Sequence, residues 1–289
     1  MNDGISQRGI VVNTTSSSKA VLMSVPMSAV KFTDTFWEPR RETTRHKTIR
    51  KQLELSEQTG RLDNFRRASG RKVIEHHQGL VFNDSDVYKT LEAASYALLD
   101  GVDNELEAMI DLAIDEIVAA QQEDGYLNTY FMFEREKERY TNLTQLHELY
   151  CYGHLIQAAI AHKRCTGQST FFNVALNVAE HLLTTFGPDK RNATDGHEEI
   201  ELALVELFRE TGDNRYLDLA IFFLDQRGQE PTVIPDRPRR TEREYYQDHL
   251  PVRDQGEIKG HAVRAMYLTT GMADVVLEKT DEAMEAALH

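Results

Sequence analysis

Three histidines stand where predicted helices begin: His147, His197 and His261. Each alone has a simple explanation, since polar residues are common in the first turn of a helix. The same residue type at three equivalent positions favours a site. The positive end of a helix dipole disfavours a charged imidazole, so we expect neutral rings that can both donate and accept hydrogen bonds. Such rings suit a ligand rich in hydroxyl groups.

Other residues near these helix starts could take part in chemistry. Asp84, Asp86 and Glu148 are the carboxylates available for an acid–base pair. Tyr126 and Tyr130 flank a turn and could supply flat surfaces on which sugar rings stack, although packing in the core explains them equally well.

The helix predicted for residues 144–165 carries two stripes. One is apolar and typical of a packing face. The other lies beside it and consists of His147, Tyr150, Cys151 and His154. A stripe of histidine and tyrosine, rather than lysine and glutamate, favours a helix that faces an internal cavity over one exposed to bulk solvent.

The spacing of apolar residues predicts an almost entirely helical chain. The expected helices are 40–57, 86–99, 104–121, 144–165, 169–186, 197–210, 214–227, 258–271 and 279–289. Residues 1–24 are rich in serine and threonine and are interpreted as a flexible leader, with residues 25–289 forming one domain. The alternating segment 25–37 contains Pro26 and predicts a short edge strand or an extended arm before the first helix.

An internal repeat suggests how the helices are arranged. Residues 166–175 align with 211–220, and each copy has a helix end at glycine followed by a polar residue and a new helix. Repeated αα-hairpins form solenoids or closed toroids. In a toroid the helices 86–99, 144–165, 197–210 and 258–271 would form the inner ring, with their N-termini at a shared rim.

Composition excludes some classes of function. The chain has 33 basic and 47 acidic side chains, for a formal charge of −14, which argues against nucleic-acid binding. No apolar run is long enough for a membrane helix, and no signal-peptide pattern is present, so we expect a cytoplasmic protein. Cys151 and Cys165 are expected to be reduced and buried.

Six ordered motifs carry a resemblance to a known family. They are the segments 32–40, 81–87, 123–130, 147–156, 196–204 and 260–264, which read FTDTFWEPR, VFNDSDV, EDGYLNTY, HELYCYGHLI, GHEEIELAL and GHAVR. Together they resemble the β-L-arabinofuranosidases of glycoside hydrolase family 127 (GH127) from about residue 25 onward. The resemblance implies an (α/α)6 barrel that hydrolyses non-reducing-end β-L-arabinofuranosides with retention of configuration. Its substrate would be an oligosaccharide or glycoconjugate that contains L-arabinofuranose.

The resemblance also implies roles for particular groups. In the family a zinc-bound cysteine thiolate is the nucleophile and a glutamate is the acid/base, while the sugar-contacting histidines carry over to His147, His197 and His261. The zinc ligands and the glutamate map beyond the aligned stretch, and neither Cys151 nor Cys165 matches one. We therefore expect no catalytic residue and no zinc in this chain.

An incomplete barrel is the expectation for this polypeptide, because four inner helices are predicted where six close a ring. It would be the N-terminal portion of the catalytic domain, inactive by itself and prone to self-association through the open ends of the barrel. Two alternatives remain: a non-catalytic sugar-binding or scaffold remnant, and another toroid sugar enzyme such as an epimerase or an unsaturated uronyl hydrolase.

Overall fold

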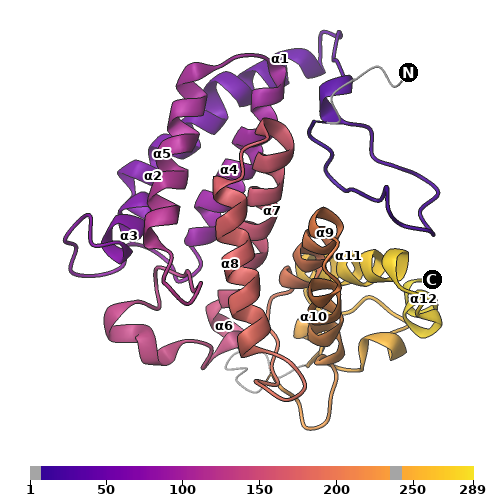
Figure 1. Ribbon diagram of the computed structural model, residues 1–289. Coiled ribbons are helices and arrows are strands. Elements are labelled where there is room, and N and C mark those ends of the chain that lie inside the picture. Colours follow the sequence, from indigo (N-terminus) through magenta and orange to yellow (C-terminus); the bar gives the residue numbers. More distant parts are fainter. Residues whose placement is uncertain (1–7, 235–242) are drawn as a thin grey trace.

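The computed structural model describes residues 8–234 and 243–289, and its regular elements there are helical (Figure 1). The α-helices are α1 (Trp37–Thr43), α2 (Arg50–Gln58), α3 (Arg61–Ala68), α4 (Asp84–Ala97), α5 (Asn104–Ala120), α6 (Leu143–Leu146), α7 (Glu148–Thr166), α8 (Thr170–Thr185), α9 (Ile200–Thr211), α10 (Asn214–Asp225), α11 (Ala262–Glu278) and α12 (Glu282–Leu288). A π-helical segment, Thr44–Ile49, joins α1 to α2. None of the helices in the described ranges has the length and apolar character needed to cross a membrane.

The inner and outer helices alternate as the toroid interpretation predicts. α4 packs on α7, α7 on α9 and α9 on α11, so these four form a curved inner row. α5, α8, α10 and α12 pack on its outer side, as Figure 1 shows for α8 against α7 and α10 against α9. The all-α toroid fold and its incompleteness in this chain are therefore confirmed.

The repeated hairpin ends in the predicted way at both copies. α7 and α9 each stop at a glycine in the left-handed region, Gly167 with φ 80° and Gly212 with φ 74°, a conformation that glycine adopts without strain. The next helix differs between the copies. The side chain of Asp213 accepts a hydrogen bond from the amide of Arg215, whereas Ser169 makes no capping bond.

Several element boundaries differ from the prediction. The helix expected over 144–165 is broken at His147, whose φ of 58° ends α6 and starts α7. α9 begins three residues after His197, and the short α3 was not predicted. Of the two alternatives for residues 25–37, the structure shows the arm and not the edge strand: the segment holds a 3-10 turn at Met27–Ala29 and has no partner strand among the described residues.

Residues 8–24 pack against the ends of the inner helices that lie opposite the rim. The amide of Gly9 donates to the carbonyl of Arg164 at the end of α7, and Ser17 Oγ donates to the carbonyl of Leu277 near the end of α11. Residues 1–7 lie outside the described ranges, and the division into a flexible leader and a barrel domain stays a prediction.

A close approach between α7 and the start of α9 depends on Gly153. A Cβ atom added there would overlap Cγ of Glu199 and lie 2.9 Å from the carbonyl carbon of Glu199. Real Cβ atoms do not come this close, and the opposing atoms are partly backbone. A glycine at position 153 therefore lets the segment before α9 lie directly against α7.

We expect Gly153→Ala to reduce the free energy of unfolding by about 1–3 kcal/mol, because overpacking outweighs the gain in helix propensity. Urea denaturation measures this change. Gly256→Ala is the matched control, since a Cβ atom at Gly256 meets nothing within 4 Å. An unchanged midpoint for Gly153→Ala would show that α9 can move away at no cost.

Candidate functional site

One buried carboxylate organises the rim. Asp195 Oδ2 accepts hydrogen bonds from the amides of Leu149 (2.9 Å) and Tyr150 (3.3 Å) in the first turn of α7. Its Oδ1 accepts from the amide of His197 at 2.9 Å. Asp195 thus caps α7 and places the His197 segment against the start of that helix.

The three predicted histidines come together at this rim. The ring centroids of His147 and His197 are 5.7 Å apart, and those of His197 and His261 are 6.5 Å apart. His261 also caps α11, because its Nδ1 accepts from the amide of Arg264 at 3.4 Å. The proximity of the three histidines that the sequence suggested is therefore present in the fold.

Aromatic and histidine rings fill the space between these residues. Tyr150 lies between His197 and His154, with centroid distances of 4.6 and 4.5 Å. Tyr267 of α11 lies 5.5 Å from the ring of His197. The set is called the ring cluster below, and its members are His147, Tyr150, His154, His197, His261 and Tyr267.

The histidines whose pKa is shifted are held neutral. Burial lowers the pKa of His197 and of His154 to about 3, and it also lowers the pKa of His147. The sequence predicted neutral imidazoles from the helix dipole, whereas in the structure the main cause is the loss of water around the rings. Nδ1 of His147 and of His197 can donate to a neighbouring backbone carbonyl, which leaves Nε2 of each neutral ring as an acceptor. Nδ1 of His261 accepts from a backbone amide, which leaves its Nε2–H as a donor.

Tyr126 and Glu148 do not lie on the rim surface. Both side chains are buried, and Tyr126 Oη donates to Glu148 Oε1 at 2.8 Å. Glu148 Oε2 accepts from the amide of Tyr140 at 2.7 Å. Of the two interpretations of Tyr126 that the sequence left open, the structure therefore favours packing in the core over a stacking surface.

The remaining rim candidates hold loops in place. Asp84 is buried and accepts from both the amide and the hydroxyl of Thr129, at 2.7 and 2.6 Å. Asp86 Oδ2 accepts from Asn83 Nδ2 at 2.6 Å. Tyr130 is half-buried, and its hydroxyl accepts from Arg135 at 2.6 Å. The Asp84–Thr129 contacts join the start of α4 to the loop after α5, and the other two bonds are local.

Three residues of the site were missed by the sequence reasoning. Asp195 precedes His197 by two residues, in a turn that the Asp-Gly pair signals. Tyr267 lies within α11, six residues after the N-cap residue His261. Glu199 was included in a motif but received no role.

The cysteines do not fit the zinc-thiolate centre that the resemblance implies. Cys151 Sγ donates to the carbonyl of Phe82 at 3.7 Å, and burial raises the pKa of its thiol well above the usual value. Burial raises the pKa of Cys165 to about 12. Within residues 8–234 and 243–289 no three His, Cys, Asp or Glu side chains are grouped to hold a metal ion.

Comparison with known proteins identifies relatives of this fold and site. Residues 29–289 match the sequence family described as β-L-arabinofuranosidase, GH127 catalytic domain. The chain is 42% identical to a non-reducing end β-L-arabinofuranosidase of Bifidobacterium longum subsp. longum, over 73% of this chain and 35% of that protein.

Solved structures agree with the sequence match. The crystal structure of a GH127 β-L-arabinofuranosidase from Geobacillus stearothermophilus T6 is similar with a TM-score of 0.86 and 39% identity, over 90% of this chain and 44% of that one. Another GH127 β-arabinofuranosidase gives a TM-score of 0.81 and 38% identity, over 91% and 42%. The chain spans about a third of the length of the curated relative and less than half of these two structures.

The buried Glu148 predicts a pH dependence of stability. Burial raises the pKa of Glu148 to about 8, against hydrogen bonds from Tyr126 and Tyr140 that lower it. In the unfolded chain the carboxyl ionises near 4.5. Between these values the folded state holds a proton that the unfolded state has lost, so this contribution to the free energy of unfolding decreases as the pH rises from 4.5 to about 8.

The side chain of Glu148→Gln cannot ionise. We therefore expect the free energy of unfolding of this variant to decrease less than that of the wild type as the pH rises from about 5.5 to 8. Urea denaturation at both pH values measures the two slopes. Glu282→Gln, at an exposed position of α12, should keep the wild-type slope. Equal slopes for Glu148→Gln and the wild type would mean that Glu148 is ionised in the folded chain.

Proposed function

The chain belongs to the GH127 family of β-L-arabinofuranosidase catalytic domains, and from that premise we propose that its ring cluster binds a non-reducing-end β-L-arabinofuranoside. The ligand would be part of an oligosaccharide or glycoconjugate. The observation that carries this proposal is the convergence of His147, His197 and His261 with two tyrosine rings at one rim.

The chemistry of the cluster matches an uncharged sugar. Neutral imidazoles donate and accept hydrogen bonds, which is what vicinal hydroxyl groups require. Tyr150 and Tyr267 are partly accessible and present aromatic faces to the C–H surface of a sugar ring. Each of the three histidines is fixed by its own backbone bonds, so little side-chain entropy is lost when the sugar binds.

We propose that this chain binds the sugar but does not hydrolyse it. Hydrolysis with retention needs a nucleophile and an acid/base group on either side of the anomeric carbon. The two thiols are buried with raised pKa values, and Glu148 is bonded to Tyr126 and Tyr140 in the core. The buried, reduced thiols also support the cytoplasm as the compartment.

We expect titration of the 289-residue chain with methyl β-L-arabinofuranoside to show saturable binding. His197→Ala should weaken it by about tenfold or more, because a half-buried ring with hydrogen-bonding capacity is lost. His46→Ala, at an exposed position before α2, is the control. Turnover of an aryl β-L-arabinofuranoside that disappears in His197→Ala would contradict the proposed lack of activity, and absence of binding would contradict the proposed function.

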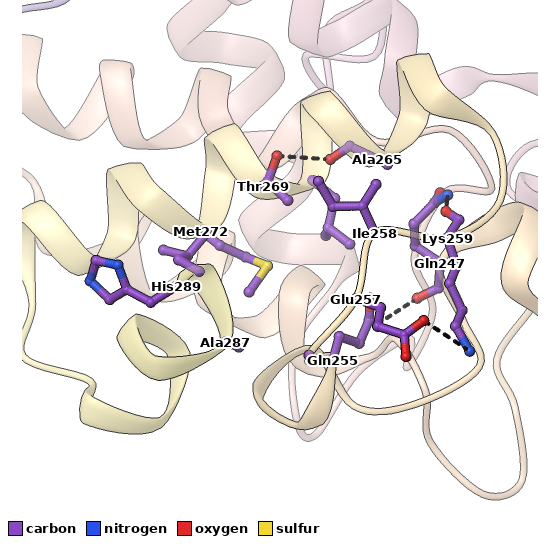
Figure 2. Close-up of a pocket in the computed structure, with 13 residues that line it drawn as sticks. Gln247, Gln255, Glu257, Ile258, Lys259, Ala265, Thr269, Met272, Ala287 and His289 are labelled. Carbon is purple, nitrogen blue, oxygen red and sulfur yellow. Dashed lines mark hydrogen bonds and ion pairs between the residues drawn. The ribbon is translucent and has the colours of Figure 1, made fainter.

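We also propose that two copies of the chain associate through the open sides of the barrel. One side is a cavity of about 190 Å³ between α11, α12 and the loop 255–259, into which Ile258, Met272 and Ala287 project (Figure 2). The other is a groove of about 380 Å³ beside α1, with Phe32 and Trp37 in its lining.

Charge favours pairing these two sides with each other. Arg40 and Arg41 line the groove beside α1. Exposed Glu257 lines the cavity, and α12 next to it carries exposed Glu282 and Glu285. A head-to-tail contact therefore brings apolar surface to apolar surface and opposite charges together.

We expect sedimentation velocity to show association that increases with protein concentration. Trp37→Glu should weaken it by about tenfold, because a large aromatic side chain would be replaced by a charge at the contact. Val73→Glu changes a fully exposed apolar residue elsewhere and should have no effect. A wild-type chain that stays monomeric at high concentration would overturn the proposal.

A further inference from the structure

A polar groove lies between α2 and α4, where α2 ends and α4 begins at the rim. Its volume is about 450 Å³, within the range of about 300–1,000 Å³ that is usual for small-molecule sites. Its polar lining comes from α2 with its C-cap, from the start of α3 and from α4: Gln52, Ser56, Thr59, Arg61, Asp86, Lys89 and Thr90. It is called the α2–α4 groove below.

The α2–α4 groove borders the ring cluster. Lys89 Nζ donates to Tyr150 Oη at 3.1 Å and lies 5.3 Å from the centre of the Tyr150 ring. The side chains of Lys89 and Asp86 are 40% and 44% exposed, so this border is open to solvent. A chain of sugar units attached to a ligand on the ring cluster therefore meets the groove on the other side of Lys89.

One face of α4 changes its character along the helix. Asp86, Lys89, Ala93 and Tyr96 follow one another at spacings of three and four residues, so they lie on the same face. Asp86 and Lys89 line the α2–α4 groove, whereas Ala93 and Tyr96 line the groove beside α1. A face used for packing alone would be apolar along its whole length, so the polar part at the rim points to a different use.

The facing side of α2 changes in the same way. Ile49, Gln52, Ser56 and Thr59 are again spaced by three and four residues. Ile49 lines the groove beside α1, and the other three residues line the α2–α4 groove. Two neighbouring helices thus both turn from apolar to polar toward the rim.

The solvent side of α2 differs from its groove side. Lys51, Glu54 and Glu57 are exposed and charged, as is usual for a helix surface in water. The groove side of the same helix carries an amide and two hydroxyl groups instead. The groove is therefore polar without having the composition of an ordinary solvated face.

Hydroxyl oxygens supply hydrogen-bond acceptors in the groove. The hydroxyl of Ser56 donates to the carbonyl of Gln52 at 3.0 Å, and that of Thr90 donates to the carbonyl of Asp86 at 2.7 Å. Each hydroxyl hydrogen is used within its own helix, so the oxygen atoms remain as acceptors for a ligand.

Two cationic side chains supply donors. The guanidinium of Arg61 donates to the carbonyl of Thr59 at 3.0 Å, which is its one hydrogen bond within residues 8–234 and 243–289. The ammonium of Lys89 has three N–H groups, one of which is used by Tyr150. A wall that offers donors beside acceptors matches the adjacent hydroxyl groups of a sugar.

We propose that the α2–α4 groove is a second subsite, which binds the sugar unit attached to an arabinofuranoside held on the ring cluster. The inference rests on the proposed sugar binding, and it specifies the ligand as a disaccharide or a longer chain. Hydroxyl groups of the second unit donate to the oxygens of Ser56 and Thr90 and accept from Arg61 and Lys89.

The test compares two kinds of ligand by calorimetric titration of the 289-residue chain. One is methyl β-L-arabinofuranoside, and the other is the disaccharide that carries the same sugar on a second arabinofuranose, in each linkage isomer. We expect at least one isomer to bind about tenfold more tightly than the methyl glycoside, because the second unit gains hydrogen bonds in the groove.

The double variant Arg61→Met, Thr90→Val removes a donor and an acceptor while keeping the apolar stem and the branched shape of the two side chains. The ratio of the two affinities should fall from about ten to about one. This ratio is the readout, since a general loss of folded protein lowers the amount that binds both ligands equally.

Arg71→Met with Thr184→Val is the matched control. Arg71 and Thr184 are exposed residues outside the groove lining, and each donates to a backbone carbonyl, that of Asp115 and that of His181 respectively. The control should keep the wild-type ratio of about ten. A ratio of about one for every isomer with the wild type, or of about ten with the groove variant, would show that the groove binds no sugar unit.

Saturation-transfer NMR locates the second unit without relying on affinities. Protons of the second unit should receive saturation from the wild type and lose most of it with the groove variant, whereas equal transfer in both proteins contradicts the second subsite. A wild type that binds neither the methyl glycoside nor any disaccharide contradicts the proposed function itself, which separates the two failures.

Discussion

The carboxylate of Asp195 is the interaction on which the site depends. It is completely buried and accepts three backbone hydrogen bonds, two from the first turn of α7 and one from His197. A further bond runs from the guanidinium of Arg227 to the carbonyl of Asp195 at 2.6 Å, and Arg227 also donates to the carbonyl of Tyr246 at 2.9 Å. The start of α7, the His197 segment and the loop that leads to His261 are thereby held by two buried residues, Asp195 and Arg227.

This arrangement explains why the ring cluster is built from segments far apart in the sequence. Burial raises the pKa of Asp195, and the opposing hydrogen bonds and charges around it lower it, so the cost of burying the carboxyl is offset only while every partner is in place. Arg227 is buried as well and lies 2.9 Å from Glu198. Replacing Arg227 or Glu198 by an uncharged residue would leave the other without its buried partner. The loss in free energy of unfolding would be far larger than for a surface ion pair.

The alternation of inner and outer helices could be predicted from apolar spacing and from the repeat at 166–175 and 211–220, because both are local patterns. The break in the helix at His147, between α6 and α7, could not be predicted from such local patterns. A non-glycine residue with φ 58° is uncommon, and here it is maintained by Asp195, which lies 46 residues away from the amide that it caps. The burial of Tyr126 and Glu148 could not be predicted either, because their spacing in the sequence does not show which side of a rim loop faces the core.

The charge state of the site also follows from burial more than from any local motif. The chain carries a net charge of −14, yet the pKa values of His147, His154 and His197 are lowered, so these rings stay uncharged beside many carboxylates. The nearby cations have other partners: the guanidinium of Arg264 lies 4.7 Å from the rings of Tyr245 and Tyr246, and Lys89 donates to Tyr150 Oη.

An anionic ligand would have to bind against the field of a protein with a net charge of −14. The field costs a neutral polyol little free energy of binding, because the polyol carries no net charge. Its hydroxyl groups can form hydrogen bonds with the donors and acceptors of the rings. Because desolvation keeps the imidazoles neutral, their hydrogen-bonding pattern should not change across the neutral pH range. The burial that Asp195 and Arg227 enforce is thus the same property on which the proposed binding of an uncharged, hydroxyl-rich ligand depends.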